Sequence, residues 1–117
     1  MERHILLVQT NALPGREDEF NEWYTNTHLK DVLQLPGYVA AQRFEYNCTS
    51  LYPGEPAVEA PYRFVAVYEI EGDASDAAKA LAAARSSMYL SPAMSEVKLS
   101  LLYTPVTERM TSQSFAN

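Results

Sequence analysis

The chain is short of the residues from which most metal, disulfide and nucleotide sites are built. Its 117 residues include one cysteine, Cys48, two histidines and four glycines. A single cysteine cannot form an internal disulfide and is typical of a reducing compartment. Two histidines and one cysteine give no ligand spacing of the zinc or iron type. The glycines lie beside turns and form no phosphate-binding loop, so we expect neither a metal nor a cofactor.

Positive charge and long apolar runs are scarce as well. Fifteen acidic residues face nine lysines and arginines, and the net charge of -6 is spread along the chain. That balance argues against a nucleic-acid partner, which would require a basic patch. The apolar run 5–8 is too short to span a bilayer or to act as a secretory signal. We therefore expect a cytoplasmic protein with no membrane partner, of a length that suits one domain.

What is present is a regular alternation of strand and helix patterns. Proline and glycine at 36–37 end the first helix, and Asp73 or Ser75 caps the second. The order β-α-β-β-α-β predicts an α+β, ferredoxin-like fold, with four antiparallel strands and both helices on one face. The expected strands are 4–10, 38–47, 62–71 and 97–104, and the expected helices are 17–35 and 77–86.

Two segments fall outside this pattern. Residues 48–61 contain three prolines and a glycine, and such a long connection is a solvated loop, a lid or a subunit contact. Residues 108–117 carry no periodicity and form either a tail or an arm onto a neighbour. We therefore divide the chain into a domain at 1–107 and a C-terminal tail at 108–117.

The middle strands predict a subunit interface. Each has apolar residues on both faces, yet the helices cover only one side of the sheet. An open face of this kind exceeds the apolar patch that monomers usually expose, and back-to-back pairing of two subunits removes it. We therefore expect a homodimer. The residues expected on one face of the second strand are Tyr38, Ala40, Gln42, Phe44 and Tyr46.

The first helix has an aromatic inner face that carries a histidine. His28 is a candidate general acid or base, or else a structural histidine that bonds a backbone carbonyl. Tyr24, one turn earlier, either assists His28 and a substrate oxygen or packs in the core. The three-and-four spacing places these residues on the inner face: Phe20, Trp23, Tyr24, Thr27, His28, Val32 and Leu35.

Further polar residues could complete such a site. Asp31 either orients the imidazole of His28 or is a surface carboxylate. Trp23 forms a pocket wall or part of the core. Arg43 and Glu69 share a sheet face if the second and third strands pair as a hairpin, and they then bind polar substrate groups or form a structural ion pair.

The motifs around these residues resemble the EthD-like branch of the dimeric α+β barrel superfamily. The resemblance implies a ferredoxin-like subunit, a dimer closed through the sheets, and a pocket between sheet and helices. His4 resembles the first-strand histidine of a plant polyketide cyclase of this superfamily, or is a frayed terminal residue. Met94 replaces the second histidine of that cyclase and cannot exchange protons. The matching segments are Trp23-Tyr24, His28-Leu29, Asp31-Val32-Leu33, Pro36-Gly37-Tyr38, Gln42-Arg43-Phe44, Tyr68-Glu69 and Ser91-Pro92-Ala93.

Two functional hypotheses follow. The superfamily includes cofactor-free cyclases, isomerases, monooxygenases and heme-handling enzymes, so the fold does not select a reaction. The first hypothesis is a cofactor-free enzyme in which His28 moves protons on a small apolar carbonyl or phenolic compound. The second is a dimer without turnover that binds a ligand or has a structural role. A solvent-connected cavity at His28 favours the first hypothesis, and a filled interior favours the second.

Overall fold

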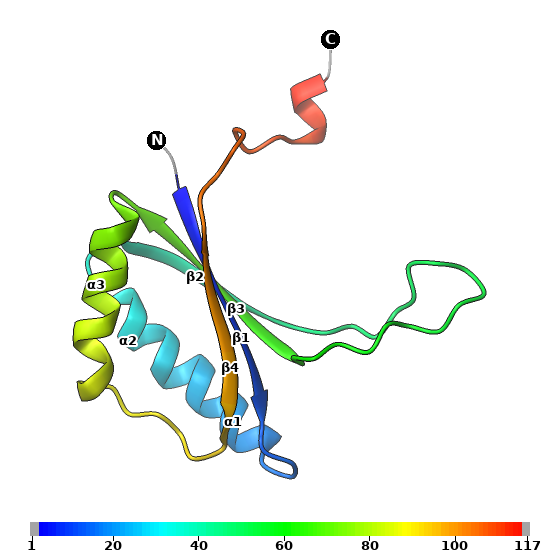
Figure 1. The fold of residues 1–117 in the computed structure, drawn as a ribbon, viewed down its shortest axis with the longest axis horizontal. Coiled ribbons are helices and arrows are strands. Elements are labelled where there is room, and N and C mark those ends of the chain that lie inside the picture. The colour runs from blue at the N-terminus through cyan, green and yellow to red at the C-terminus, as the bar shows by residue number, and fades with distance from the viewer. Residues whose placement is uncertain (1–2, 116–117) are drawn as a thin grey trace.

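The computed structural model describes residues 3–115 and contains one antiparallel sheet with the helices packed against one face (Figure 1). The strands lie in the order β2-β3-β1-β4. This arrangement confirms the expected ferredoxin-like α+β fold. Within residues 3–115, no helix is both long and apolar enough to cross a bilayer. The elements are β1 (Arg3–Ala12), α1 (Glu17–Trp23), a π-helical turn (Tyr24–His28), α2 (Leu29–Leu33), β2 (Tyr38–Glu45), β3 (Phe64–Glu71), α3 (Ala74–Ala84), a 3-10 turn (Arg85–Ser87), β4 (Met94–Tyr103) and a second 3-10 turn (Ser112–Phe115).

The strand register decides which side chains face the helices. In the central pair, Leu6 lies opposite Tyr68 and Thr10 lies opposite Phe64. All four side chains are buried, because successive residues of a strand point to opposite faces and these positions share the helix side. The alternation expected for the third strand is thereby confirmed.

The first helix ends, and α3 begins, at the residues that the sequence predicted as their caps. Gly37 has a φ of +91°, and a Cβ at this position would lie 3.2 Å from the carbonyl oxygen of Glu71. Only glycine fits this combination of left-handed backbone and close approach. Asp73 caps α3, because its carboxylate accepts a hydrogen bond from the backbone N–H of Asp76 at 2.9 Å. The caps predicted from the sequence are confirmed.

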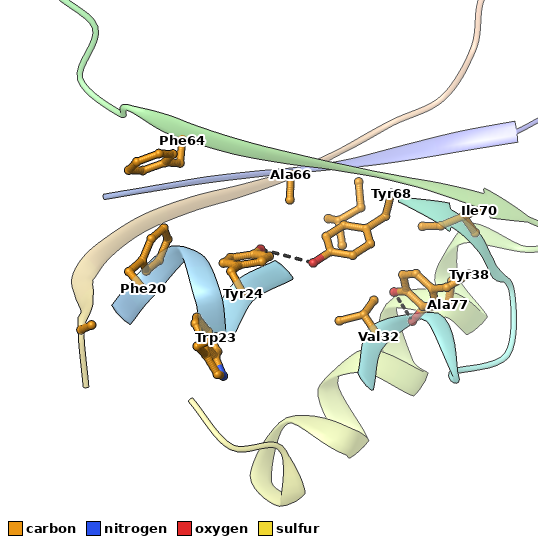
Figure 2. Close-up of a cluster of buried hydrophobic side chains, with 12 residues drawn as sticks. Phe20, Trp23, Tyr24, Val32, Tyr38, Phe64, Ala66, Tyr68, Ile70 and Ala77 are labelled. Carbon is orange, nitrogen blue, oxygen red and sulfur yellow. Dashed lines mark hydrogen bonds between the residues drawn. The ribbon is translucent and has the colours of Figure 1, made fainter. Parts of the chain in front are cut away.

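Phe20 is fully buried between the first helix and the sheet, beside Phe64 at one end of the aromatic cluster (Figure 2). Its side chain is 0% exposed, and its ring lies 5.4 Å from that of Phe64 and 5.7 Å from that of Tyr24. Truncation at such a position removes apolar burial and leaves a cavity. We expect Phe20→Ala to lower the free energy of unfolding by about 3–5 kcal/mol in urea denaturation. Leu51→Ala, at a side chain that is 84% exposed, is the control and is expected to change it by less than about 0.5 kcal/mol.

Strand β2 differs from the expected alternation. Tyr38 lies opposite Ile70, but Ala40 lies opposite Glu69, so Val39 is an extra residue in the ladder. Because a bulge of one residue reverses the alternation, Tyr38 faces the helices. Its hydroxyl donates a hydrogen bond to the carbonyl oxygen of Ala77 at 2.8 Å. The prediction that Tyr38 shares a face with Ala40 is therefore wrong.

The face of the sheet opposite the helices is open and apolar. It carries Ile5, Phe44, Leu99, Leu101 and Tyr103, and each of these side chains is more than one third exposed. After β4 the chain passes this face, and the segment 105–110 borders a broad cleft along it. The connection between β2 and β3 extends away from the body of the molecule (Figure 1). The predicted tail ends at 116–117, which lie outside the described residues.

Candidate functional site

A π-helical turn at Tyr24–His28 interrupts the first helix. The backbone N–H of Leu29 donates to the carbonyl oxygen of Tyr24, which is the i to i-5 pattern of a π turn. In a regular α-helix, residues five apart lie about 140° apart around the axis. Here the rings of Trp23 and His28 stack with centroids 4.9 Å apart and an interplanar angle of 28°. The widened turn therefore aligns His28 with Trp23.

The same turn changes one expected position. Thr27 was predicted on the inner face of the helix, but its side chain is exposed. An extra residue in a turn displaces its neighbours from the 3.6-residue period. His28 itself stays half-buried, as the prediction required.

The imidazole of His28 is held by aromatic contacts. Trp23 stacks on one face of the ring, and Tyr24 makes an edge contact with a centroid separation of 4.9 Å and an angle of 87°. Among the described residues, the Nδ1 atom of His28 is buried and has no hydrogen-bond partner. The Nδ1 atom therefore lacks the bond to a backbone carbonyl that a purely structural role of His28 predicts. A buried nitrogen without a hydrogen-bond partner lowers the free energy of unfolding by about 1–3 kcal/mol. A ligand that forms a hydrogen bond with Nδ1 would remove this cost.

A cavity of about 50 Å³ lies beside His28 between the helices and the sheet. Its inner wall is formed by buried side chains from the first helix and from strands β1 and β3, whereas Arg85 and Lys98 in its lining are exposed. The cavity is therefore mostly apolar inside, with a few buried hydroxyl groups, and has two charged side chains at its exposed end, the mouth. The remaining lining residues are Leu6, Val8, Thr10, Tyr24, Val32, Tyr68, Leu81, Met88, Leu90, Met94 and Ser100.

Burial sets the protonation of His28. Removal of the ring from water lowers its pKa below the ordinary value of 6.5, because the charged form loses hydration. The charge of Asp31 acts in the opposite direction, and that of Lys98 lowers the pKa further. His28 is therefore a neutral imidazole at neutral pH, able to accept a proton.

This pKa shift makes the stability of the protein depend on pH. Because the folded pKa lies below 6.5, the unfolded chain takes up a proton first as the pH falls. We expect the His28 contribution to be fully present above pH 6.5 and to decline as the pH drops from 6.5 through the folded pKa. Urea denaturation across this range should show a smaller loss of stability in His28→Gln than in the parent protein. An equal loss of stability in both proteins would contradict a lowered pKa for His28 in the folded state.

Two tyrosines joined by a hydrogen bond (Figure 2) contribute hydroxyl groups to the inner wall, as does the buried Thr10. The hydroxyl of Tyr68 donates to that of Tyr24 over 3.2 Å. Burial raises the pKa of both phenols above 10, so both stay protonated. Since Tyr24 accepts this bond, its own hydrogen is left to donate. Tyr68 was not among the predicted site residues, although its place on the helix-facing side of the third strand was a signal for it.

Arg43 lies behind Tyr24 rather than in the cavity. Its guanidinium is 4.7 Å from the centroid of the Tyr24 ring and donates hydrogen bonds to Thr25 and Asn21. Burial lowers the pKa of Arg43 but leaves it charged, because arginine loses its proton only at extreme pH. The contact is a cation–π interaction that fixes Tyr24 in position.

The predicted pairing of Arg43 with Glu69 is wrong. Arg43 lies opposite Ala66 and faces the helices, whereas Glu69 lies opposite Ala40 on the open face. Glu69 pairs instead with Arg3, with a nitrogen–oxygen distance of 2.9 Å. The bulge at Val39 lies beyond both positions, so the register that places Arg43 and Glu69 on opposite faces is set by the long β2–β3 connection, whose geometry the strand pattern does not reveal.

Of the other predicted residues, Trp23 and Asp31 act on His28 from outside the cavity lining, and His4 lies apart from it. Trp23 stacks on His28, and its indole N–H donates to the carbonyl oxygen of Tyr89 at 3.1 Å. Asp31 does not bond Nδ1 of His28 and acts on it only through its charge. His4 contacts the hydroxyl of Thr104 at 3.1 Å, away from the cavity lining. Among residues 3–115, no three histidine, cysteine or acidic side chains gather as metal ligands would.

Comparisons with solved structures define the fold class of the chain. The alignment with the heme-degrading protein MhuD of Mycobacterium tuberculosis covers 92% of this chain and 99% of MhuD, with a TM-score of 0.58 and 18% sequence identity. The alignment with an EthD family protein of Bacillus halodurans covers 94% of this chain and 100% of that protein, with a TM-score of 0.55 and 16% identity. The alignment with a candidate monooxygenase of Shewanella loihica covers 92% of this chain and 98% of that protein, with a TM-score of 0.52 and 20% identity.

These matches show that the chain shares the ferredoxin-like fold of these proteins. The resemblance to EthD-like proteins is confirmed at the level of the fold. No family model matches the sequence, and no curated protein matches it by sequence comparison. At identities of 20% or less, the shared fold carries no reaction to this chain.

Proposed function

We propose that the protein is a cytoplasmic, cofactor-free acid–base enzyme that acts on a small, largely apolar carbonyl or phenolic compound. The observation that carries this proposal is His28, a half-buried imidazole at a cavity, with an unpartnered Nδ1 and a lowered pKa. A neutral imidazole in such a setting is a suitable general base. The reaction class is a proton shift, as in a cyclase or an isomerase.

The surrounding residues have distinct roles in this proposal. His28 accepts a proton from the carbon beside a carbonyl, and the bonding electron pair moves to the carbonyl oxygen as an enolate. Tyr24 donates its free hydrogen to that oxygen, supported by the hydrogen bond from Tyr68. Trp23 positions the imidazole, and the charge of Asp31 stabilises its protonated form. Return of the proton to another atom completes the shift.

The proposed enzyme is a homodimer closed through the open sheet faces. Exposed Leu99 and Leu101 on that face favour an apolar partner surface, and a second copy of the chain supplies an identical one. Two segments extend beyond the sheet, 105–110 and the projecting β2–β3 connection. In the proposed dimer both contact the partner subunit.

The direct test is exchange of carbon-bound protons in deuterated water. A panel of small enolisable ketones and phenols is incubated with the protein. NMR follows the loss of proton signals beside the carbonyl of each ketone, and ortho and para to the hydroxyl of each phenol. We expect at least one compound to exchange faster than in buffer, with saturation in its concentration. Uniform exchange at the buffer rate across the panel would count against an enzyme.

A second candidate function is a dimer without turnover that binds a ligand or has a structural role. The size of the cavity favours the structural role, because about 50 Å³ is well below the roughly 300–1,000 Å³ of typical small-molecule sites. Saturable binding of panel compounds without acceleration of exchange would support a ligand-binding dimer, and the absence of both binding and exchange would support a structural one.

A further inference from the structure

The charges that line the cavity are of one sign. Arg85 follows α3 and Lys98 lies on β4, and they line the cavity together with His28. No carboxylate belongs to this lining among the described residues. The whole chain, by contrast, has fifteen acidic residues against nine lysines and arginines. A lining with two cations is therefore opposite in sign to the protein as a whole.

These two cations also lack the glutamate partners that three arginines of the surface have. The ion pairs found within residues 3–115 use Arg3, Arg16 and Arg63, whose charges are thereby balanced by glutamates. Neither Arg85 nor Lys98 forms an ion pair in that part of the structure. Asp31 influences His28 through its charge but does not line the cavity. The charge at the mouth is therefore left for a ligand.

The lining also changes in polarity along its depth. Tyr24 and Tyr68 are 2% and 1% exposed at the inner wall, whereas Arg85 and Lys98 are exposed. We propose that the substrate is an amphipathic organic anion, whose apolar body enters the cavity and whose carboxylate or phenolate stays at the mouth with Lys98 and Arg85. This inference rests on the proposed function, because it names the substrate class of the same site.

The test compares two probes of equal shape and different charge, benzoate and benzamide. Binding is measured by NMR, from the broadening of each probe's own aromatic proton signals as protein is added, a readout that every variant shares. We expect benzoate to bind about tenfold more tightly than benzamide, with a preference that weakens as salt is added. Lys98→Gln and Arg85→Gln should each weaken benzoate binding about three- to fivefold and leave benzamide unchanged.

Lys79→Gln is the matched control, since it removes one positive charge from an exposed position of α3 outside the cavity. It should leave benzoate binding unchanged. Equal affinity for both probes, a loss in Lys79→Gln as large as in Lys98→Gln, or no saturable binding of benzoate at millimolar concentration would each overturn the inference. His28→Gln separates the two proposals. If it still binds benzoate, and the parent protein binds benzoate without catalysing proton exchange, the anion site stands and the enzyme does not.

Discussion

Replacement of His28 by glutamine is expected to lower kcat/KM for proton exchange by about 10²–10⁴-fold, the usual contribution of a general base. Glutamine keeps an amide of similar size in the cavity but cannot accept a proton at neutral pH. The overall fold should persist, because the ring is only half-buried and its Nδ1 has no partner to lose among the described residues. Exchange is measured by NMR on a compound that the parent protein accelerates.

The control for this prediction is His4→Gln. His4 contacts Thr104 and lies outside the cavity lining, so its replacement should change kcat/KM by less than about twofold. A pH profile adds a second readout. The kcat/KM of the parent protein should fall only at pH values below 6.5, because the pKa of His28 is lowered from that value. Unchanged exchange in His28→Gln would exclude His28 as the base.

Introduction of a charge at Leu101 is expected to separate the proposed dimer into monomers. Leu101 lies opposite Leu7 near the middle of the open face and is 37% exposed in the single subunit. In a symmetric dimer, Leu101→Arg places two uncompensated charges in one apolar interface. We expect the dimer dissociation constant to rise by at least about 10²-fold. Light scattering at micromolar concentration should then give the mass of one chain.

Leu33→Arg is a matched control for this prediction. Leu33 is 38% exposed and lies on α2, on the helix side of the sheet. The same substitution at the same exposure should therefore leave the mass at twice that of the chain. A parent protein that is already monomeric, or a Leu101→Arg variant that stays dimeric, would show that the open face is not the interface.

The element order could be predicted because its signals are local. Glycine at position 37 and the Asp73 cap depend on backbone angles and hydrogen bonds within a few residues. The alternation of Phe64, Ala66 and Tyr68 follows the two-residue period of a strand. Such signals give the type of each element without knowledge of its partners.

The irregular features could not be predicted in the same way. The bulge at Val39 and the π turn at Tyr24–His28 each insert one residue into a regular repeat, and no residue type marks such an insertion. Consequently the face of Tyr38 was misassigned. The partner of Arg43 was misassigned because the register across the long β2–β3 connection is not marked by the residues of the strands. The inward position of His28 was correctly predicted, although the π turn that stacks it on Trp23 was not.

The most direct test of this account is an NMR titration of His28. The chain has two histidines, so the signals are assigned by comparison with His4→Gln. The account predicts a pKa clearly below 6.5 for His28, with ring signals that shift when a ligand occupies the cavity. A pKa at or above 6.5, with ring signals that no ligand moves, would contradict it.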